Sequence, residues 1–142
     1  QLSVASAVVF GCGSVGSTVA TMLLRAGVGK VIVSDPDDLE WANVSRHELG
    51  GAAVGMKKSI ELARRLQRDF PHASVTGYDD TVQSAIYGEV AWLSDADIVV
   101  SATGSGQADK TLNSWQKKCG RRIPVVYGWT EPYGVAGHAI AI

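Results

Sequence analysis

The apolar residues of this chain gather in short continuous runs that are separated by longer stretches of helical periodicity. Short runs of this kind are typical of strands buried on both faces of a sheet. They predict strands at Ala5–Phe10, Val31–Val33, Ser74–Tyr78, Ile98–Ala102, Ile123–Tyr127 and Gly137–Ile142. Apolar residues at helical spacing predict helices over Ser14–Arg25, Gly55–Asp69, Val82–Leu93 and Gln107–Cys119, while Asp37–Ala53 is expected to be irregular. Alternating strands and helices predict an α/β, Rossmann-like, doubly wound and mostly parallel sheet with helices on both faces.

Length and charge narrow the picture further. The 142 residues suit a single domain, 1–142, and a formal net charge of −1 gives no general attraction to nucleic acid or to an acidic membrane. No apolar run is long enough to span a bilayer, and the chain closes inside the apolar run Ala139–Ile142. We therefore expect a cytoplasmic domain that is part of a longer protein.

Cysteines and basic clusters add two expectations. The two cysteines, Cys12 and Cys119, form no CxxC pair, which argues against a zinc site and against a disulfide framework. Basic residues are expected on solvated surfaces, either on one helix face or near a helix end where the dipole favours cations. These residues are Arg64, Arg65 and Arg68 in the first group and Lys117, Lys118, Arg121 and Arg122 in the second.

A glycine-rich turn, Gly11-Cys12-Gly13-Ser14-Val15-Gly16, joins the first strand to the first helix. The first N–H groups of a helix have no intrahelical partner, and the helix dipole favours an anion there. Gly11 allows a tight turn, Gly13 lets the backbone approach phosphates, and Gly16 lets the helix pack close to the strand. We predict that Gly11, Gly13, Ser14 and Gly16 hold a nucleotide phosphate; the alternative is a tight turn that binds nothing.

The residues after the second strand bear on which nucleotide binds. Asp35 ends that strand at the spacing expected of an acid that accepts hydrogen bonds from ribose hydroxyls. Asn43 and Arg46 follow in a loop that starts at the carboxyl end of the strand, and Lys58 lies near the start of the next helix, from where it can reach the same place. Cations suit the β- and γ-phosphates of a triphosphate. An NAD-dependent oxidoreductase would explain the glycine turn and Asp35 but not Asn43, Arg46 and Lys58.

These motifs together resemble the ThiF/MoeB/HesA family, the ubiquitin-activating-enzyme-like adenylyltransferases. The matching segments are Gly11–Gly16, Leu24–Gly29, Asp35-Pro36-Asp37, Asn43-Val44-Ser45-Arg46, Gly55-Met56-Lys57-Lys58 and Phe70-Pro71. The resemblance implies ATP and Mg²⁺, and attack on the α-phosphate by the C-terminal carboxylate of a ubiquitin-like or sulfur-carrier protein or peptide. It also implies a homodimer, with Asp35 on the ribose, Asp37 in the nucleotide site, and Asn43, Arg46 and Lys58 on the phosphates. Arg46 and Lys58 are the candidate catalytic residues, because the reaction needs cations around a polyanion.

One position departs from the family pattern. The family has an Asp after the fourth strand that helps hold the metal, whereas this chain has Gly104. Asp97 lies at the opposite end of that strand, and Asp109 in the next helix is the nearest alternative. Magnesium held by phosphates and water would preserve activity. The alternative is a non-catalytic nucleotide-binding scaffold domain.

The remaining candidates have weaker support. His47 could face the nucleotide, although a surface loop is the more usual place for such a histidine. His138 could face the acyl group or be structural, and a peptide tail could lie beside Trp129, Glu131 and Tyr133. Cys12 is expected to be buried and inert, so a thioester-forming cysteine is expected outside this chain.

Overall fold

The computed structural model describes residues 1–120 and 122–142, so Arg121, one of the predicted basic residues, lies outside the described residues. Among these residues, six strands form one sheet in the order β3-β2-β1-β4-β5-β6. The strands are β1 (Ser6–Phe10), β2 (Lys30–Ser34), β3 (Ser74–Tyr78), β4 (Ile98–Ser101), β5 (Val125–Thr130) and β6 (Gly137–Ala141). The strands β1 to β5 pair in parallel and β6 pairs antiparallel to β5. The predicted mostly parallel sheet is confirmed.

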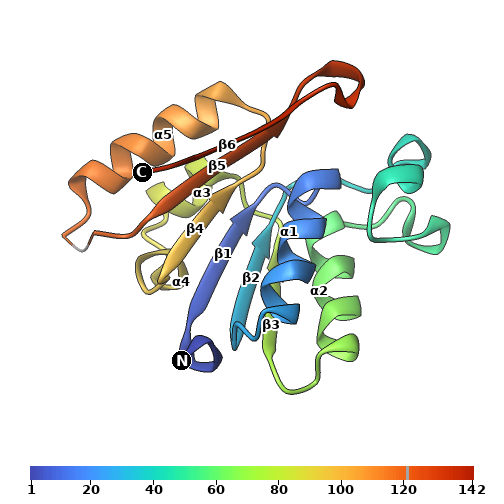
Figure 1. Ribbon diagram of the computed structural model, residues 1–142, viewed down its shortest axis with the longest axis horizontal. Helices are drawn as coiled ribbons and strands as arrows, with labels where there is room; N and C mark the ends of the chain where they lie inside the picture. Colours follow the sequence, from blue (N-terminus) through green and yellow to red (C-terminus); the bar gives the residue numbers. More distant parts are fainter. Residues whose placement is uncertain (121) are drawn as a thin grey trace.

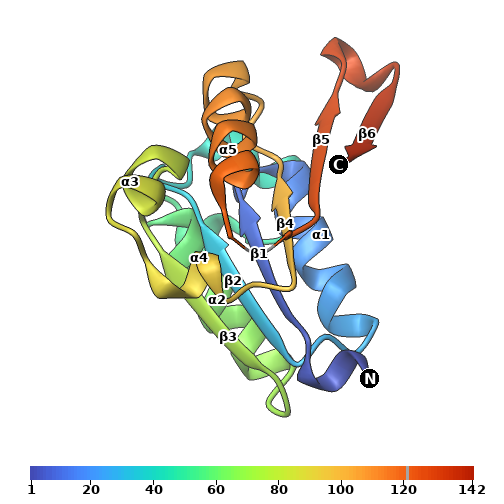
Figure 2. The same cartoon turned by 90° about the vertical axis from the view of Figure 1, so that its left-hand side faces the viewer.

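Helices cover both faces of the sheet, as Figures 1 and 2 show. The helices are α1 (Ser14–Arg25), α2 (Lys58–Asp69), α3 (Val82–Tyr87), α4 (Ala91–Ser94) and α5 (Gly106–Lys118). Short 3₁₀ turns are η1 (Leu2–Val4), η2 (Trp41–Arg46), η3 (Gly51–Ala53) and η4 (Pro132–Gly134). The helices α1 and α2 lie on one face, and α3, α4 and α5 lie on the other. No helix in the described part of the chain is long and apolar enough to cross a membrane.

The two faces of β1 explain why the sheet is buried on both sides. Ala7 and Val9 belong to the core beneath α1 and α2, whereas Val8 and Phe10 belong to the core beneath α3, α4 and α5. All four are at most 1% exposed, because successive strand side chains point to opposite faces. A strand without polar alternation is therefore the sequence signature of this two-sided burial.

Three predicted elements differ from the structure. The segment predicted as one helix over Val82–Leu93 is two helices, because Glu89 adopts a φ of 49° after Gly88 ends α3. The final apolar run forms β6 at the edge of the sheet, where every residue is exposed, rather than a buried strand. The helix predicted from Gly55 begins at Lys58, since Gly55 has a φ of 84° that an α-helix does not allow.

The strand order places a switch point between β1 and β4. The chain runs outward from β1 to β2 and β3 and then returns to β4 on the other side of β1. The loops after β1 and β4 therefore leave the sheet in opposite directions, and a crevice forms at their carboxyl ends. The glycine turn, Asp35 and Thr103 all lie at this edge.

Candidate nucleotide-binding site

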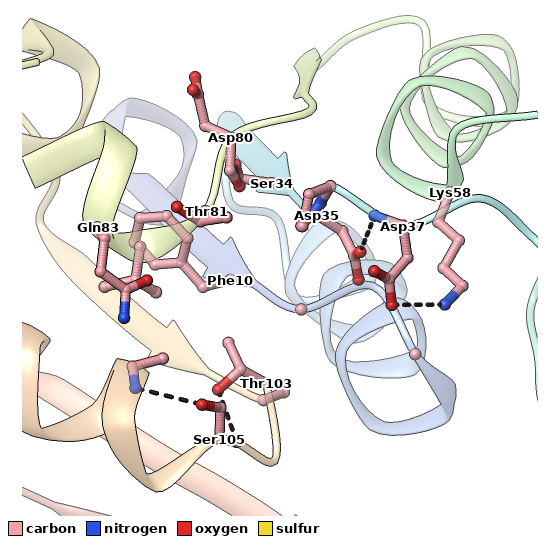
Figure 3. Close-up of a pocket in the computed structure, with 16 residues that line it drawn as sticks. Phe10, Ser34, Asp35, Asp37, Lys58, Asp80, Thr81, Gln83, Thr103 and Ser105 are labelled. Atoms are coloured by element: carbon pink, nitrogen blue, oxygen red, sulfur yellow. Dashed lines mark hydrogen bonds and ion pairs between the residues drawn. The ribbon is translucent and has the colours of Figure 1, made fainter.

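A cavity of about 400 Å³ lies at the carboxyl ends of the parallel strands (Figure 3). This volume falls in the range of small-molecule sites. The cavity is lined by Phe10, Gly11, Gly13, Ser34, Asp35, Pro36, Asp37, Lys58, Asp80, Thr81, Val82, Gln83, Ala102, Thr103, Ser105 and Ala108. Lys58 and Asp37 lie at one end, and Gln83, Thr103 and Ser105 lie at the other. The cavity thus has one end with the Lys58–Asp37 pair and another end of neutral polar groups, and the Phe10 ring lies toward the neutral end.

The glycine turn has the shape that its sequence predicts. Gly11 has a φ of 85°, and a Cβ there would lie 2.5 Å from the carbonyl oxygen of Ala102. A Cβ on Gly16 would lie 1.7 Å from the carbonyl oxygen of Gly11, so α1 packs directly against the turn. A Cβ on Gly13, by contrast, would meet no described atom within 4 Å. The turn is closed at Gly11 and Gly16 and open at Gly13, where an anion can approach the start of α1.

The amino end of α1 carries partial positive charge that its own residues do not neutralise. Gly13 is the N-cap and has no side chain to cap the helix, and the first turn contains no acidic residue. Free N–H groups and the helix dipole favour an anion at this place. Gly13 lines the cavity, so these donors border it.

Asp35 holds the turn in place from the end of β2. Its Oδ2 accepts a hydrogen bond from the Cys12 N–H at 2.6 Å, and its Oδ1 accepts one from the Asp37 N–H at 2.8 Å. The residue is 7% exposed, and its own carbonyl oxygen accepts a hydrogen bond from the Ser59 hydroxyl at 3.0 Å. Each carboxylate oxygen keeps a second lone pair. Asp35 is therefore a structural clamp in this state, with capacity left for the predicted ribose contact.

Lys58 is the cation of the cavity. It is the first residue of α2 and its side chain is 11% exposed. Its Nζ lies 3.2 Å from Oδ2 of Asp37, whose side chain is 68% exposed. The buried ammonium group is thus paired with an exposed carboxylate. A phosphate group could take the place of that carboxylate beside the ammonium.

Of the residues predicted for the site, the cavity brings together Gly11, Gly13, Asp35, Asp37 and Lys58. Its lining does not include Ser14, Gly16, Asn43 or Arg46.

Asn43 and Arg46 occupy the 3₁₀ turn η2, outside the cavity lining. The Asn43 side chain accepts a hydrogen bond from the Glu40 N–H at 3.1 Å and so caps this turn. Arg46 is exposed, and its Nη1 donates to the carbonyl oxygen of Ala42 at 3.4 Å. The predicted phosphate contacts of both residues stay predictions, and that of Arg46 requires its side chain to leave Ala42.

Gly104 lies in the loop after β4, between the cavity residues Thr103 and Ser105. It has a φ of 65°, and a Cβ there would meet no described atom within 4 Å. Asp109, the nearest alternative acid, accepts a hydrogen bond from the Ser101 hydroxyl at 2.6 Å and does not line the cavity. Within residues 1–120 and 122–142 no group of three or more His, Cys, Asp or Glu residues could hold a metal ion.

His47 is more enclosed than a surface-loop histidine. Its ring is half-buried, its Nε2 lies within hydrogen-bond reach of the Cys12 carbonyl oxygen, and its Nδ1 accepts a hydrogen bond from the Leu49 N–H at 3.0 Å. Burial lowers the pKa of the ring, and the positive charge of Lys58 lowers it further. The Cys12 carbonyl, Asp35 and Glu48 act in the opposite direction.

The two cysteines differ in burial. Cys12 is 0% exposed, and burial, with the negative charge of Asp35, raises the pKa of its thiol well above the usual range. The predicted burial of this thiol is confirmed, and its inertness stays a prediction. Cys119 is partly exposed at the end of α5.

The other predicted candidates lie outside the cavity lining, on the β5–β6 hairpin. The rings of Trp129 and His138 stack at 5.0 Å, and Nε2 of His138 lies 3.0 Å from Oε1 of Glu131. Tyr133, at the hairpin tip, is fully exposed.

Several lining residues were absent from the sequence prediction: Phe10, Asp80, Thr81, Gln83, Thr103 and Ser105. Most of them are polar and follow β3 or β4 closely. Because the carboxyl ends of parallel strands meet at one edge of the sheet, polar residues after each strand are the signal that could have found them.

Comparison with known proteins identifies the family of the chain. A model of the ThiF family matches residues 1–142. The chain is 34% identical over 131 residues to the sulfur carrier protein ThiS adenylyltransferase of Bacillus subtilis (strain 168), covering 90% of this chain and 38% of that protein. It is 31% identical over 139 residues to the ATP-dependent ubiquitin transferase-like protein Cap2 of Pseudomonas aeruginosa (strain BWHPSA011 / Pa011), covering 93% of this chain and 23% of that protein.

A solved structure shows the same fold. The E. coli tRNA N6-threonylcarbamoyladenosine dehydratase TcdA in complex with ATP superposes with a TM-score of 0.76 at 29% identity, over 89% of this chain and 51% of that one. The chain therefore spans about half of the TcdA chain and less than two fifths of the other two relatives. The family model, the fold and the ordered motifs agree that this chain belongs to the ThiF family.

Proposed function

We propose that this domain binds ATP in the cavity and transfers its adenylyl group to the C-terminal carboxylate of a ubiquitin-like or sulfur-carrier protein or peptide. The observation that carries the proposal is one cavity with an uncapped helix start at Gly13 and the buried cation Lys58 on its wall. These are the two features that a polyphosphate needs. The names of the ThiS adenylyltransferase and of Cap2, and the ATP bound in the TcdA structure, support the choice of ATP and of the acceptor class.

The proposed reaction needs positioning and charge rather than a protein nucleophile. A carboxylate oxygen of the acceptor attacks the α-phosphorus, and the bond from that phosphorus to the oxygen bridging the β-phosphorus breaks, so that pyrophosphate leaves. Lys58 and the start of α1 stabilise the negative charge that builds up on the phosphates. Arg46 would join them once its side chain turns from the Ala42 carbonyl.

Magnesium fits this site in a limited way. The chemistry it supplies when bound is neutralisation of phosphate charge. Magnesium keeps several waters and is commonly held by one or two carboxylates together with substrate phosphates. The exposed carboxylate of Asp37 lines the cavity and would provide one such ligand.

ATP–pyrophosphate exchange in the intact protein tests the proposal, with candidate carrier proteins as acceptors. We expect exchange in the wild type and a loss of at least tenfold in both Arg46→Ala and Lys58→Ala. Lys30→Ala is the matched control, because Lys30 is exposed at the amino end of β2, at the opposite edge of the sheet from the cavity. Equal losses in all three variants would contradict the assignment of the site.

Two other outcomes would point to the alternatives. Tight ATP binding without exchange for any acceptor would favour a nucleotide-binding scaffold, the reading that Gly104 motivates. Thermal stabilisation by NAD but not by ATP would favour an oxidoreductase. The homodimer implied by the family stays a prediction, which light scattering on the purified protein would check.

A further inference from the structure

The loop between β2 and α2 is joined to the glycine turn by a histidine that does not line the cavity. Nδ1 of His47 accepts the Leu49 N–H, so the proton of the neutral ring resides on Nε2, which donates to the Cys12 carbonyl oxygen. Both ring nitrogens are thereby committed to backbone groups. A direct contact from His47 to a nucleotide would require one of these bonds to break.

Both ends of this connection are firmly held. Leu49 is 6% exposed and packs in the core beneath α1 and α2, so its N–H has a fixed position. At the other end, the Cys12 N–H donates to Oδ2 of Asp35 at 2.6 Å. The Cys12 peptide units therefore receive His47 on one side and Asp35 on the other.

The bonds continue to the cation of the cavity. Oδ1 of Asp35 accepts the Asp37 N–H, and Oδ2 of Asp37 pairs with Lys58. A single series of contacts thus runs from Leu49 through His47, Cys12 and Asp35 to the lysine. Arg46 is the residue before His47, so the part of the loop that bears Asn43 and Arg46 is connected to this series through His47.

We propose that His47 is a positioning residue, whose neutral ring ties the loop bearing Arg46 to the phosphate-binding turn. The proposal rests on the proposed function, because this tie affects activity only if Arg46 serves the phosphates. Protonation of Nδ1 removes the acceptor of the Leu49 N–H, so acid pH loosens the loop. The charged groups that act on the ring are Asp35 from the end of β2, Lys58 from α2, and Glu48 from the loop itself, which lies 3.4 Å from Nη2 of Arg65.

The tie can be tested without any nucleotide. In the intact protein labelled with ¹⁵N-histidine, long-range ¹⁵N–¹H spectra report the tautomer and the pKa of each ring. We expect His47 to be the Nε2–H tautomer and to titrate below the ordinary histidine value of about 6.5. An Nδ1–H tautomer, or a pKa at or above that value, would overturn the proposal.

The consequence for binding is tested by calorimetry with ATP at pH 7.5. His47→Leu removes both bonds, and we expect the Kd for ATP to rise about tenfold. His47→Gln keeps an amide donor for the Cys12 carbonyl and cannot titrate, so we expect near-normal affinity that does not fall on acidification as the wild type's does. His72→Gln removes an exposed histidine beyond the far end of α2 and keeps His47, so its affinity should fall on acidification as the wild type's does.

A double-mutant cycle distinguishes positioning from general structural damage. If His47 acts through Arg46, His47→Leu should have little further effect on ATP affinity in an Arg46→Ala background. Additive losses would overturn the proposal. If His47→Leu does not fold, the tautomer of His47 and the pH dependence of ATP affinity in His47→Gln still test the proposal. If the wild type binds no ATP, the proposed function fails, while the ¹⁵N spectra still show whether His47 makes its two hydrogen bonds to Cys12 and Leu49.

Discussion

Alanine substitutions at Gly13 and Gly16 separate the part of the glycine turn that serves the fold from the part that would face a ligand. The two residues lie three positions apart in the same turn. A Cβ on Gly16 would lie 1.7 Å from the carbonyl oxygen of Gly11, whereas a Cβ on Gly13 would meet no described atom within 4 Å. The same methyl group therefore meets backbone at one position and open space at the other.

The expected magnitudes follow from these contacts. In Gly16→Ala the turn and α1 must separate by more than 1 Å, and such overpacking costs about 3 kcal/mol, offset by about 1 kcal/mol of improved helix propensity. We expect Gly16→Ala to lower the free energy of unfolding by about 2 kcal/mol. In Gly13→Ala, the φ of −72° suits alanine, so a poorer N-cap and a less flexible unfolded chain nearly cancel, within about 1 kcal/mol.

Thermal unfolding and ATP calorimetry on both variants make the comparison. We expect Gly16→Ala to lose several degrees of Tm, and Gly13→Ala to keep its Tm but bind ATP at least tenfold more weakly, about 1.4 kcal/mol. A Gly13→Ala variant that binds ATP as the wild type does would refute the phosphate cradle. A Gly16→Ala variant of unchanged stability would refute the close packing of α1 on the turn.

Three further predictions concern single side chains. Asp35→Asn places an amide NH₂ where a carboxylate oxygen accepts a backbone N–H, so we expect about 2–3 kcal/mol of destabilisation in urea unfolding without nucleotide, and no such loss in the exposed Asp38→Asn. Gly104→Asp should raise the rate of ATP–pyrophosphate exchange at limiting Mg²⁺ several-fold, and its positive φ should lower the free energy of unfolding by about 1 kcal/mol. Gly104→Asn is the uncharged control, and an unchanged magnesium dependence in Gly104→Asp would argue against a missing metal ligand. Iodoacetamide at pH 8 should modify the partly exposed Cys119 well before the buried Cys12, and equal rates would show that Cys12 is accessible. The raised pKa of Cys12 favours the folded state below the ordinary thiol pKa of about 8.5, and this contribution is lost as the pH rises above that value.

The strands and the glycine turn were accessible from sequence because local pattern determines them. The alternation of Ala7 and Val9 with Val8 and Phe10 places apolar side chains on both faces, which marks a doubly covered strand whatever the rest of the chain does. The apolar spacing also placed Lys58 near the start of a helix, although it began that helix at Gly55, whose φ of 84° excludes it from α2.

The rest depended on contacts between distant segments. Nothing local indicates that Asp35 already holds two N–H groups. Gly88 offers a local signal for the end of α3, but the prediction followed the apolar spacing across it. The direction of Arg46 depends on how its loop folds back, which periodicity does not describe. His47 was judged by the polarity of its neighbours in sequence, whereas its surroundings are set by Cys12, 35 residues away.

The clamp formed by Asp35 has a consequence for how such domains diverge. Because the acid holds the turn and the start of the next loop, selection for folding alone preserves it, together with the glycines that pack around the turn. A lineage that lost its chemistry would still display the whole glycine-and-acid fingerprint. In this domain the fingerprint therefore reports architecture, and a claim of present-day activity has to rest on residues that the fold itself can spare.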